Sequence, residues 1–535
     1  MKILKFYFIS SLILADGIDN ITFDWSGQFG YVSQNGIIRW NKDWNSNQLF
    51  FDGTWSIFPR MFGPRIDGGF RKPINELSLA EDSVGVNSYF KYDQGDYLLD
   101  RFSFGLDYKT NNRHAYLHGF KRSYAGSFNQ YDNDSFQPLQ QSYIVSYQSV
   151  NENDEGGFSL GHFNTYSGFP DSLDGGLFDN RITTSNIFWE SSIGNLETRI
   201  AIDHFLQRYL AMHSLSYYDS SRFLSRSQYQ GNIIWRMDEG KQILIKAESN
   251  NRSIRSNSLY NFNWYELSLE YRSNIFKIIS SFITDRDILF FNNGFIIDKR
   301  FRNFRIYFDY RSNHRPMHPY YAMINTIDEV PSFINETSIV SIFDIEFEKN
   351  QFLATISQSK DDNILWESIL EEPIDNKIHR MIDFKYKTSL IPHIAIETSY
   401  KLQESKIYYS NGIGKWMGLK LESSFDLFKD YMLLDASIAF QRIDDRFNSS
   451  LINPIEMIPL HGHAVNNDML TPVNIINANI TAYVSTFTIS YEWFNIREII
   501  LASSSQEDNN YFTIHPLLPA LGRQINLSIK WKFKD

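Results

Sequence analysis

The sequence predicts an all-β protein, a transmembrane antiparallel up-and-down β-barrel of about 22 strands, in a range of roughly 16 to 24. Three observations predict it. Apolar and polar residues alternate with a period of two in many separate segments, short turns alternate with long polar stretches, and the chain ends on an aromatic strand.

The last strand carries the clearest alternation. Its apolar residues are Ile525, Leu527, Ile529, Trp531 and Phe533, and a polar residue stands between each pair. Successive side chains leave a strand on opposite sides, so this strand has one apolar face and one polar face.

The same alternation recurs upstream. It covers Arg101–Tyr108, Tyr265–Arg272, Phe304–Arg311, Phe343–Glu348 and Ile382–Lys387. The polar positions of these and neighbouring strands are often charged, as expected where they face a water-filled lumen. The candidate lumen-lining residues are Arg101, Asp107, Glu266, Glu270, Arg305, Asp309, Arg311, Asp344, Glu346, Asp383, Lys385, Glu397, Lys420 and Glu422.

The connections separate a barrel from a soluble sandwich, whose strands can alternate in the same way. Short turns such as Lys109–Asn112 and Asp238–Lys241 alternate along much of the chain with long polar stretches. A barrel with tight turns on one rim and loops on the other produces this order. The long stretches are Tyr124–Gln140, Ser167–Arg181, Arg208–Ser225, Ser312–Glu336, Ser359–Lys377, Arg442–Thr471 and Ser503–Leu521.

The N-terminus predicts export. Met1–Lys5 holds two lysines, an apolar run follows, and Ala15 is a small residue at its end, so residues 1–15 are expected to be a signal peptide. Residues 16–47 have only weak periodicity and could form a small constriction in the lumen. The barrel is expected to occupy 48–535, with Gln48–Phe58 as its first candidate strand.

Composition excludes several classes of protein. The chain has no cysteine, which rules out disulfides and thiolate metal sites, and its net charge of −11 argues against nucleic acid as a partner. Aromatic residues make up 16% of the chain although its mean hydropathy is −0.35. Alternating lipid-facing and water-facing positions would give this combination.

The ending from His515 to Phe533 resembles that of TonB-dependent outer-membrane receptors. In that family a proline-containing loop leads through Gly-Arg into a final aromatic strand, and Pro519, Gly522 and Arg523 stand in those places. The resemblance implies an outer-membrane location in a Gram-negative-type bacterium. It also implies that Ile525, Leu527, Ile529, Trp531 and Phe533 form a C-terminal signal for the barrel assembly machinery.

The chain departs from that family in two respects. Only about 32 residues separate Ala15 from the first candidate strand, which is too few for the family's plug domain, and Lys534 and Asp535 follow the terminal aromatic Phe533. The resemblance therefore implies a receptor-like barrel without a full plug domain, whose function is closer to that of a porin.

No segment predicts a catalytic, metal or cofactor site. His461 and His463, with Asp468 nearby, lack a third ligand at diagnostic spacing. The acidic segments Asp171–Asp174 and Asn151–Glu155 lack a complete calcium-loop pattern. Gly157-Phe-Ser-Leu-Gly161 matches the Gly-x-Ser-x-Gly pattern of a nucleophile elbow. Its alternation of apolar with small residues indicates a strand instead.

We therefore expect a non-enzymatic outer-membrane channel for small hydrophilic solutes. Its other expected partners are outer-membrane lipid and the barrel assembly machinery, with no nucleic acid and no identified protein partner. The alternative is an accessory, adhesive or structural barrel that acts through long extracellular loops. A soluble exported β-protein is a third hypothesis.

Overall fold

A computed structural model gives the fold of the chain. The residues that it describes are 18–23, 30–34, 37–40, 84–125, 137–168, 172–214, 220–238, 240–255, 259–285, 288–316, 333–361, 378–391, 393–404, 415–428, 431–444, 472–496 and 523–534.

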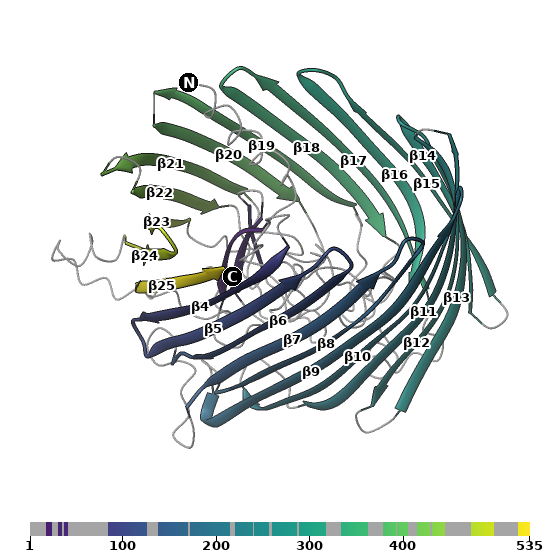
Figure 1. Cartoon of the computed structure of the whole chain (residues 1–535), viewed down its shortest axis with the longest axis horizontal. Helices are drawn as coiled ribbons and strands as arrows, with labels where there is room; N and C mark the ends of the chain where they lie inside the picture. The colour runs from purple at the N-terminus through teal and green to yellow at the C-terminus, as the bar shows by residue number, and fades with distance from the viewer. Residues whose placement is uncertain are drawn as a thin grey trace, which may run out of the picture.

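Twenty-two antiparallel strands, β4 to β25, form one closed barrel in which every strand pairs with its neighbours in sequence (Figure 1). The ring closes where β25 pairs with β4, from Asn526 opposite Gly95 to Lys534 opposite Asn87. The predicted fold class and the predicted number of about 22 strands are both confirmed. The bounds are β4 Gly85–Gly95, β5 Leu99–Lys109, β6 Arg113–Ser123, β7 Leu139–Val150, β8 Asp154–Ser167, β9 Ser172–Ile193, β10 Leu196–Ser214, β11 Ser220–Asp238, β12 Lys241–Arg255, β13 Leu259–Arg272, β14 Phe276–Asp285, β15 Ile288–Arg300, β16 Phe304–Pro316, β17 Phe333–Phe347, β18 Asn350–Asp361, β19 Ile378–Ile391, β20 Ile394–Glu404, β21 Lys415–Leu427, β22 Met432–Asp444, β23 Val473–Val484, β24 Phe487–Phe494 and β25 Gln524–Lys534.

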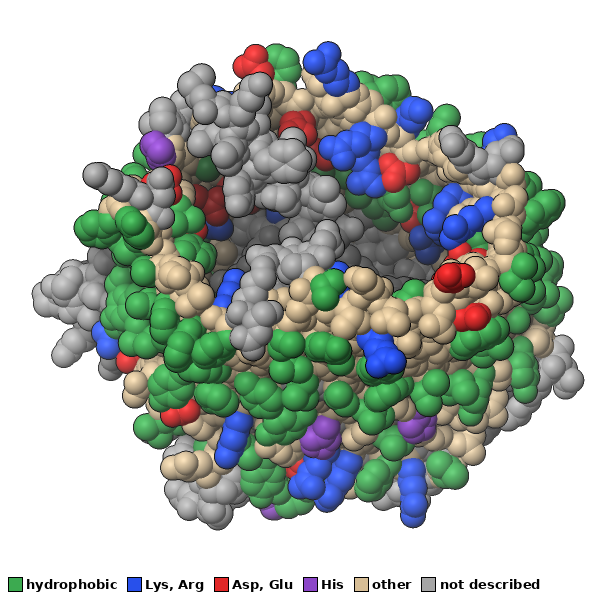
Figure 2. Space-filling model, viewed as in Figure 1, with side chains coloured by type: hydrophobic (Ala, Val, Ile, Leu, Met, Phe, Trp, Pro, Cys, Tyr) green, Lys and Arg blue, Asp and Glu red, His purple; other side chains and the backbone are tan. Residues whose placement is uncertain are grey.

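The apolar face of the alternating strands is the outer one. Large apolar side chains on it are exposed, such as Phe102 at 46%, Leu267 at 53% and Ile529 at 38%. Hydrophobic side chains cover the outer wall of the ring, and charged side chains are visible inside it (Figure 2). A soluble protein would bury such residues, so this surface is suited to the hydrocarbon of a membrane.

The two rims differ in the length of their connections. On one, the turn rim, every connection between consecutive strands has two to four residues, as at 194–195 and 428–431. On the other, the loop rim, connections range from two residues at 286–287 to 29 at 495–523. The predicted sorting is therefore confirmed for the short turns, while the loop rim carries short connections as well.

Two of the predicted long loops are largely strand. Most of Ser167–Arg181 lies in β9, and Arg208–Ser225 is divided between β10 and β11. These strands have 22, 19 and 19 residues, whereas about 9–11 residues cross a bilayer as a tilted strand. Ladder hydrogen bonds join backbone groups, so pairing continues toward the loop rim where the sequence is polar on both faces.

Upstream of the barrel, β1 (Ile18–Phe23), β2 (Gly30–Gln34) and β3 (Ile37–Trp40) form a separate three-stranded antiparallel sheet. It falls within the outline of the ring in the projection of Figure 1. The candidate first strand Gln48–Phe58 lies outside the described residues, and the closed ring begins at β4. Within the described part of the chain, no helix is long and apolar enough to span a membrane.

Candidate functional site: the inner wall of the barrel

The predicted lumen-lining residues lie in seven barrel strands: β5, β13, β16, β17, β19, β20 and β21. All of them fall on the face opposite the exposed apolar side chains. On β5, for example, Arg101 and Asp107 alternate with exposed Phe102 and Leu106. We call this face the inner wall. That a solute contacts these residues stays a prediction.

Charges on the inner wall are often paired within one strand, two residues apart. Asp309 binds Arg311 at 2.9 Å and Glu270 binds Arg272 at 3.1 Å. Residues two apart on a strand share a face, so an acid and a base at this spacing neutralise each other in place. These pairs balance part of the charge on the inner wall.

Between β13 and β16 these pairs join into a wider network. Lys277 binds the second carboxylate oxygen of Glu270 at 2.7 Å. The Arg305 guanidinium donates to both oxygens of Asp298, each at 2.7 Å, and the Tyr307 hydroxyl donates to Asp309 at 3.0 Å. Bidentate arginine–carboxylate pairs fix the relative orientation of the two side chains, so Arg305 and Asp298 hold each other in place.

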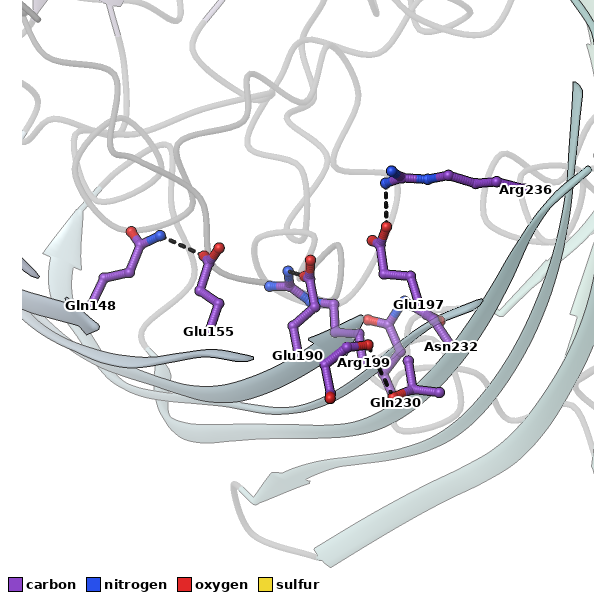
Figure 3. A network of polar contacts seen from close by, with 10 residues as sticks. Gln148, Glu155, Glu190, Glu197, Arg199, Gln230, Asn232 and Arg236 are labelled. Atoms are coloured by element: carbon purple, nitrogen blue, oxygen red, sulfur yellow. Dashed lines mark hydrogen bonds and ion pairs between the residues drawn. The ribbon is translucent and has the colours of Figure 1, made fainter. Parts of the chain in front are cut away.

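A second network, absent from the sequence prediction, crosses β7 to β11 (Figure 3). Arg199 donates to Glu190 at 2.8 Å and lies over the Phe188 ring, with its guanidinium carbon 4.5 Å from the centroid. Gln148 donates to Glu155 and Arg236 donates to Glu197. The labelled side chains project from one side of the sheet toward the space enclosed by the ring (Figure 3).

The inner wall is hollowed over β19 to β24, where a pocket of about 520 Å³ opens into the lumen. Its floor includes the small residues Ser399, Gly418, Ser437 and Ala439. Ser399 lies directly opposite Gly418 in the sheet. Longer side chains stand around these positions, and this difference in length makes the hollow. The lining residues are Lys385, Lys387, Glu397, Ser399, Gly418, Leu419, Lys420, Glu422, Ser437, Ala439, Phe440, Gln441, Asn477, Ala478, Asn479, Glu492 and Phe494.

The hollow brings together four predicted residues, Lys385, Glu397, Lys420 and Glu422. The two oxygens of Glu422 bind Lys387 at 3.1 Å and Lys420 at 2.5 Å. On the far side, Asn479 donates to Glu492 at 3.2 Å. The hollow therefore offers ammonium, carboxylate and amide groups to a polar solute.

Solved structures share this architecture. The FrpB iron transporter from Neisseria meningitidis (F3-3 variant) superposes with a TM-score of 0.64 at 8% identity, covering 86% of this chain and 84% of that one. The siderophore receptor PirA from Pseudomonas aeruginosa gives 0.57 at 8% identity, covering 85% and 81%. The copper transporter OprC gives 0.59 at 9% identity, covering 84% and 81%. The chain has the fold of an outer-membrane receptor barrel.

That fold agrees with the resemblance found at the C-terminal strand. No family model matches the sequence, and no curated protein matches it. The closed ring and its apolar outer surface place this barrel in the outer membrane of a Gram-negative-type bacterium.

The remaining candidate motifs do not make a site in the described part of the barrel. Gly157–Gly161 lies in β8 and is a strand, as its alternation predicted. The pair His461 and His463 lies outside the described residues. Among the described residues, no three His, Asp or Glu side chains group as metal ligands do.

Proposed function

We propose that this receptor-type barrel is an outer-membrane transporter that passes small hydrophilic solutes through its lumen. The observation that carries the proposal is the closed ring of 22 strands with a polar, ion-paired inner wall. Side chains alone cannot fill a barrel of this width, so the rest of its interior holds water or other parts of the chain.

The similar structures support transport as the general activity, since they are those of an iron transporter, a siderophore receptor and a copper transporter. On this chain, the hollow at β19 to β24 is the proposed contact point for a solute. Its ammonium, carboxylate and amide groups suit a hydrophilic solute better than an apolar one.

Conductance tests the proposal. The full chain, purified in detergent and inserted into a planar bilayer, is expected to give stepwise current. Liposomes that contain it are expected to swell in isotonic solutions of small sugars and amino acids. If the folded barrel is silent in both assays, the pore hypothesis fails and the alternative of a barrel acting through its loops gains support.

We also propose that residues 16–47 narrow the lumen. The support is their separate sheet, β1 to β3, which the barrel strands do not include. Removing residues 18–40 from the mature chain is expected to raise the single-channel conductance. A deletion variant that folds and conducts like the full chain would show that the segment does not constrict the lumen.

A further inference from the structure

A row of cations crosses the outer surface of the barrel on the loop-rim side. Cross-strand pairing joins Lys121 to Gln141, Gln141 to Asn164, and Asn164 to Arg181. It continues from Arg181 to Arg208, from Arg208 to Phe223 and from Phe223 to Arg255. We call these seven residues on β6 to β12 the cationic row: Lys121, Gln141, Asn164, Arg181, Arg208, Phe223 and Arg255.

The four cations of the row face outward and are exposed. Each lies on the same face of its strand as the apolar belt, for example Lys121 with exposed Leu117 and Arg208 with exposed Leu206. Figure 2 shows basic and histidine side chains gathered beside the hydrophobic belt on the outer surface.

Arg181 and Arg208 are the pair that needs explanation, because they stand directly opposite each other on β9 and β10. Like charges at directly opposed positions destabilise a sheet. Arg181 is partly offset by Asp179, whose side chain is only 4% exposed, at 2.9 Å. Within the described residues, Arg208, Lys121 and Arg255 form no ion pair, so the row keeps an excess of positive charge.

The height of the row fits the headgroup layer. Arg208 follows Leu206 by two residues and Lys121 follows Leu117 by four, both toward the loop rim. At about 3.3 Å per residue and a tilt of roughly 40°, the cations stand on the order of 5–10 Å beyond these apolar side chains. The loop rim is the external rim in such barrels, so the row lies at the outer leaflet.

We propose that the cationic row binds the phosphate groups of an anionic glycolipid in the outer leaflet. Arginine donates to phosphate oxygens through a planar fork, and an anion between Arg181 and Arg208 would relieve their repulsion. The amides of Gln141 and Asn164 and the Phe223 ring, which is 52% exposed, complete a surface that suits a sugar headgroup beside acyl chains. This surface is separate from the lumen and does not depend on transport.

Binding of lipid A to the purified full-length barrel in non-ionic detergent tests the proposal, with native mass spectrometry to count bound lipid. The double variant Lys121→Gln/Arg208→Gln removes two cations that have no ion-pair partner among the described residues, so its fold should be kept. We expect it to bind diphosphorylated lipid A about fivefold more weakly, in line with the modest strength of exposed charge pairs. Arg208→Lys, which keeps the charge but lacks the planar fork, should bind with an affinity between those of the unchanged protein and Arg208→Gln, and binding should weaken with salt.

Lys360→Gln is the matched control, because Lys360 is an exposed outward cation on β18, far from the row in the ring. It should bind like the unchanged protein. The proposal is overturned if Lys360→Gln loses as much affinity, if dephosphorylated lipid A binds equally well, or if millimolar inorganic phosphate displaces the lipid completely. Capture of an acidic protein by the row in the absence of lipid would also overturn it.

Discussion

Trp531 on β25 and Phe90 on β4 meet edge to face across the seam that closes the barrel, with ring centroids 5.5 Å apart and ring planes at 74°. The two residues are direct cross-strand partners. Trp531 also stacks on Phe487 of β24, with centroids 4.9 Å apart. One indole ring therefore joins the last two strands of the chain to the first strand of the barrel.

Replacing Trp531 with alanine should weaken this seam. Aromatic pairs contribute beyond their buried area, so we expect Trp531→Ala to lower the free energy of unfolding by about 2–3 kcal/mol. Urea titration of the barrel in lipid vesicles, followed by heat-modifiable migration on gels, measures the change.

The control for the seam is Phe428→Ala, because Phe428 is 74% exposed in the turn after β21. We expect it to change stability by less than about 0.5 kcal/mol, as for other surface substitutions. Equal effects of the two substitutions would show that the seam contacts add nothing to stability.

Gly105 on β5 leaves space for the ring of Tyr89, which lies directly opposite on β4 and is 4% exposed. A Cβ at Gly105 would stand 2.1 Å from Cε1 of Tyr89, so the ring would have to move. We expect Gly105→Ala to destabilise the barrel by about 1–3 kcal/mol, the usual effect of overpacking. Urea unfolding in vesicles checks this value.

A double-mutant cycle identifies the cause. In a Tyr89→Ala background the ring is absent, and Gly105→Ala should then cost much less. If the cost is the same in both backgrounds, the effect comes from the glycine backbone and the packing explanation is wrong.

The two faces of the barrel could be predicted because the alternation of apolar and polar residues that distinguishes them lies within each strand. In Phe102–Tyr108 and Ile525–Phe533, every second residue is apolar, and these residues lie on the outer face, where Phe102, Leu106, Tyr108, Leu527 and Ile529 are exposed. Strand count and ring closure follow from repeating that pattern. The role of Phe533 as part of an assembly signal stays a prediction.

Strand length could not be predicted where the apolar half of the pattern is missing. Around Asp179 and Asn180, within the predicted loop Ser167–Arg181, both faces of β9 are polar, so the sequence is like that of a loop while the backbone remains paired. The hollow was also beyond prediction. It depends on the register of six strands that brings Lys385 and Glu492, more than a hundred positions apart, to one surface.

Arg199 is one of two arginines in the network in Figure 3, and its removal should leave Glu155 and Glu190 facing one another. Glu155 and Glu190 are direct cross-strand partners, and Glu190 pairs in turn with Arg199. We expect Arg199→Met to destabilise the barrel by about 2 kcal/mol through the lost ion pair and the lost contact with Phe188. Urea unfolding at low salt is the measurement.

Adding Glu190→Gln to Arg199→Met should restore part of the lost stability, because one of the two opposed carboxylates is then neutral. The side-chain volumes hardly change between the single and the double variant. If the double variant is less stable than Arg199→Met alone, repulsion between the acids is not the cause of the loss.

Glu422 forms ion pairs with two lysines of the hollow, so replacing it with glutamine should make the inner wall more positive there. Its carboxylate binds Lys387 and Lys420, and Glu422→Gln leaves both ammonium groups without that anion. Charged side chains that line a pore set its ion preference. We expect the permeability ratio to shift about twofold toward anions, more at low salt, where screening is weak. The reversal potential in a potassium chloride gradient across a planar bilayer measures the shift.

Glu152→Gln, in the exposed turn between β7 and β8, removes the same charge away from the hollow and should leave the ratio unchanged. A reversal potential that responds equally to both substitutions would mean that the hollow does not lie on the path of the ions.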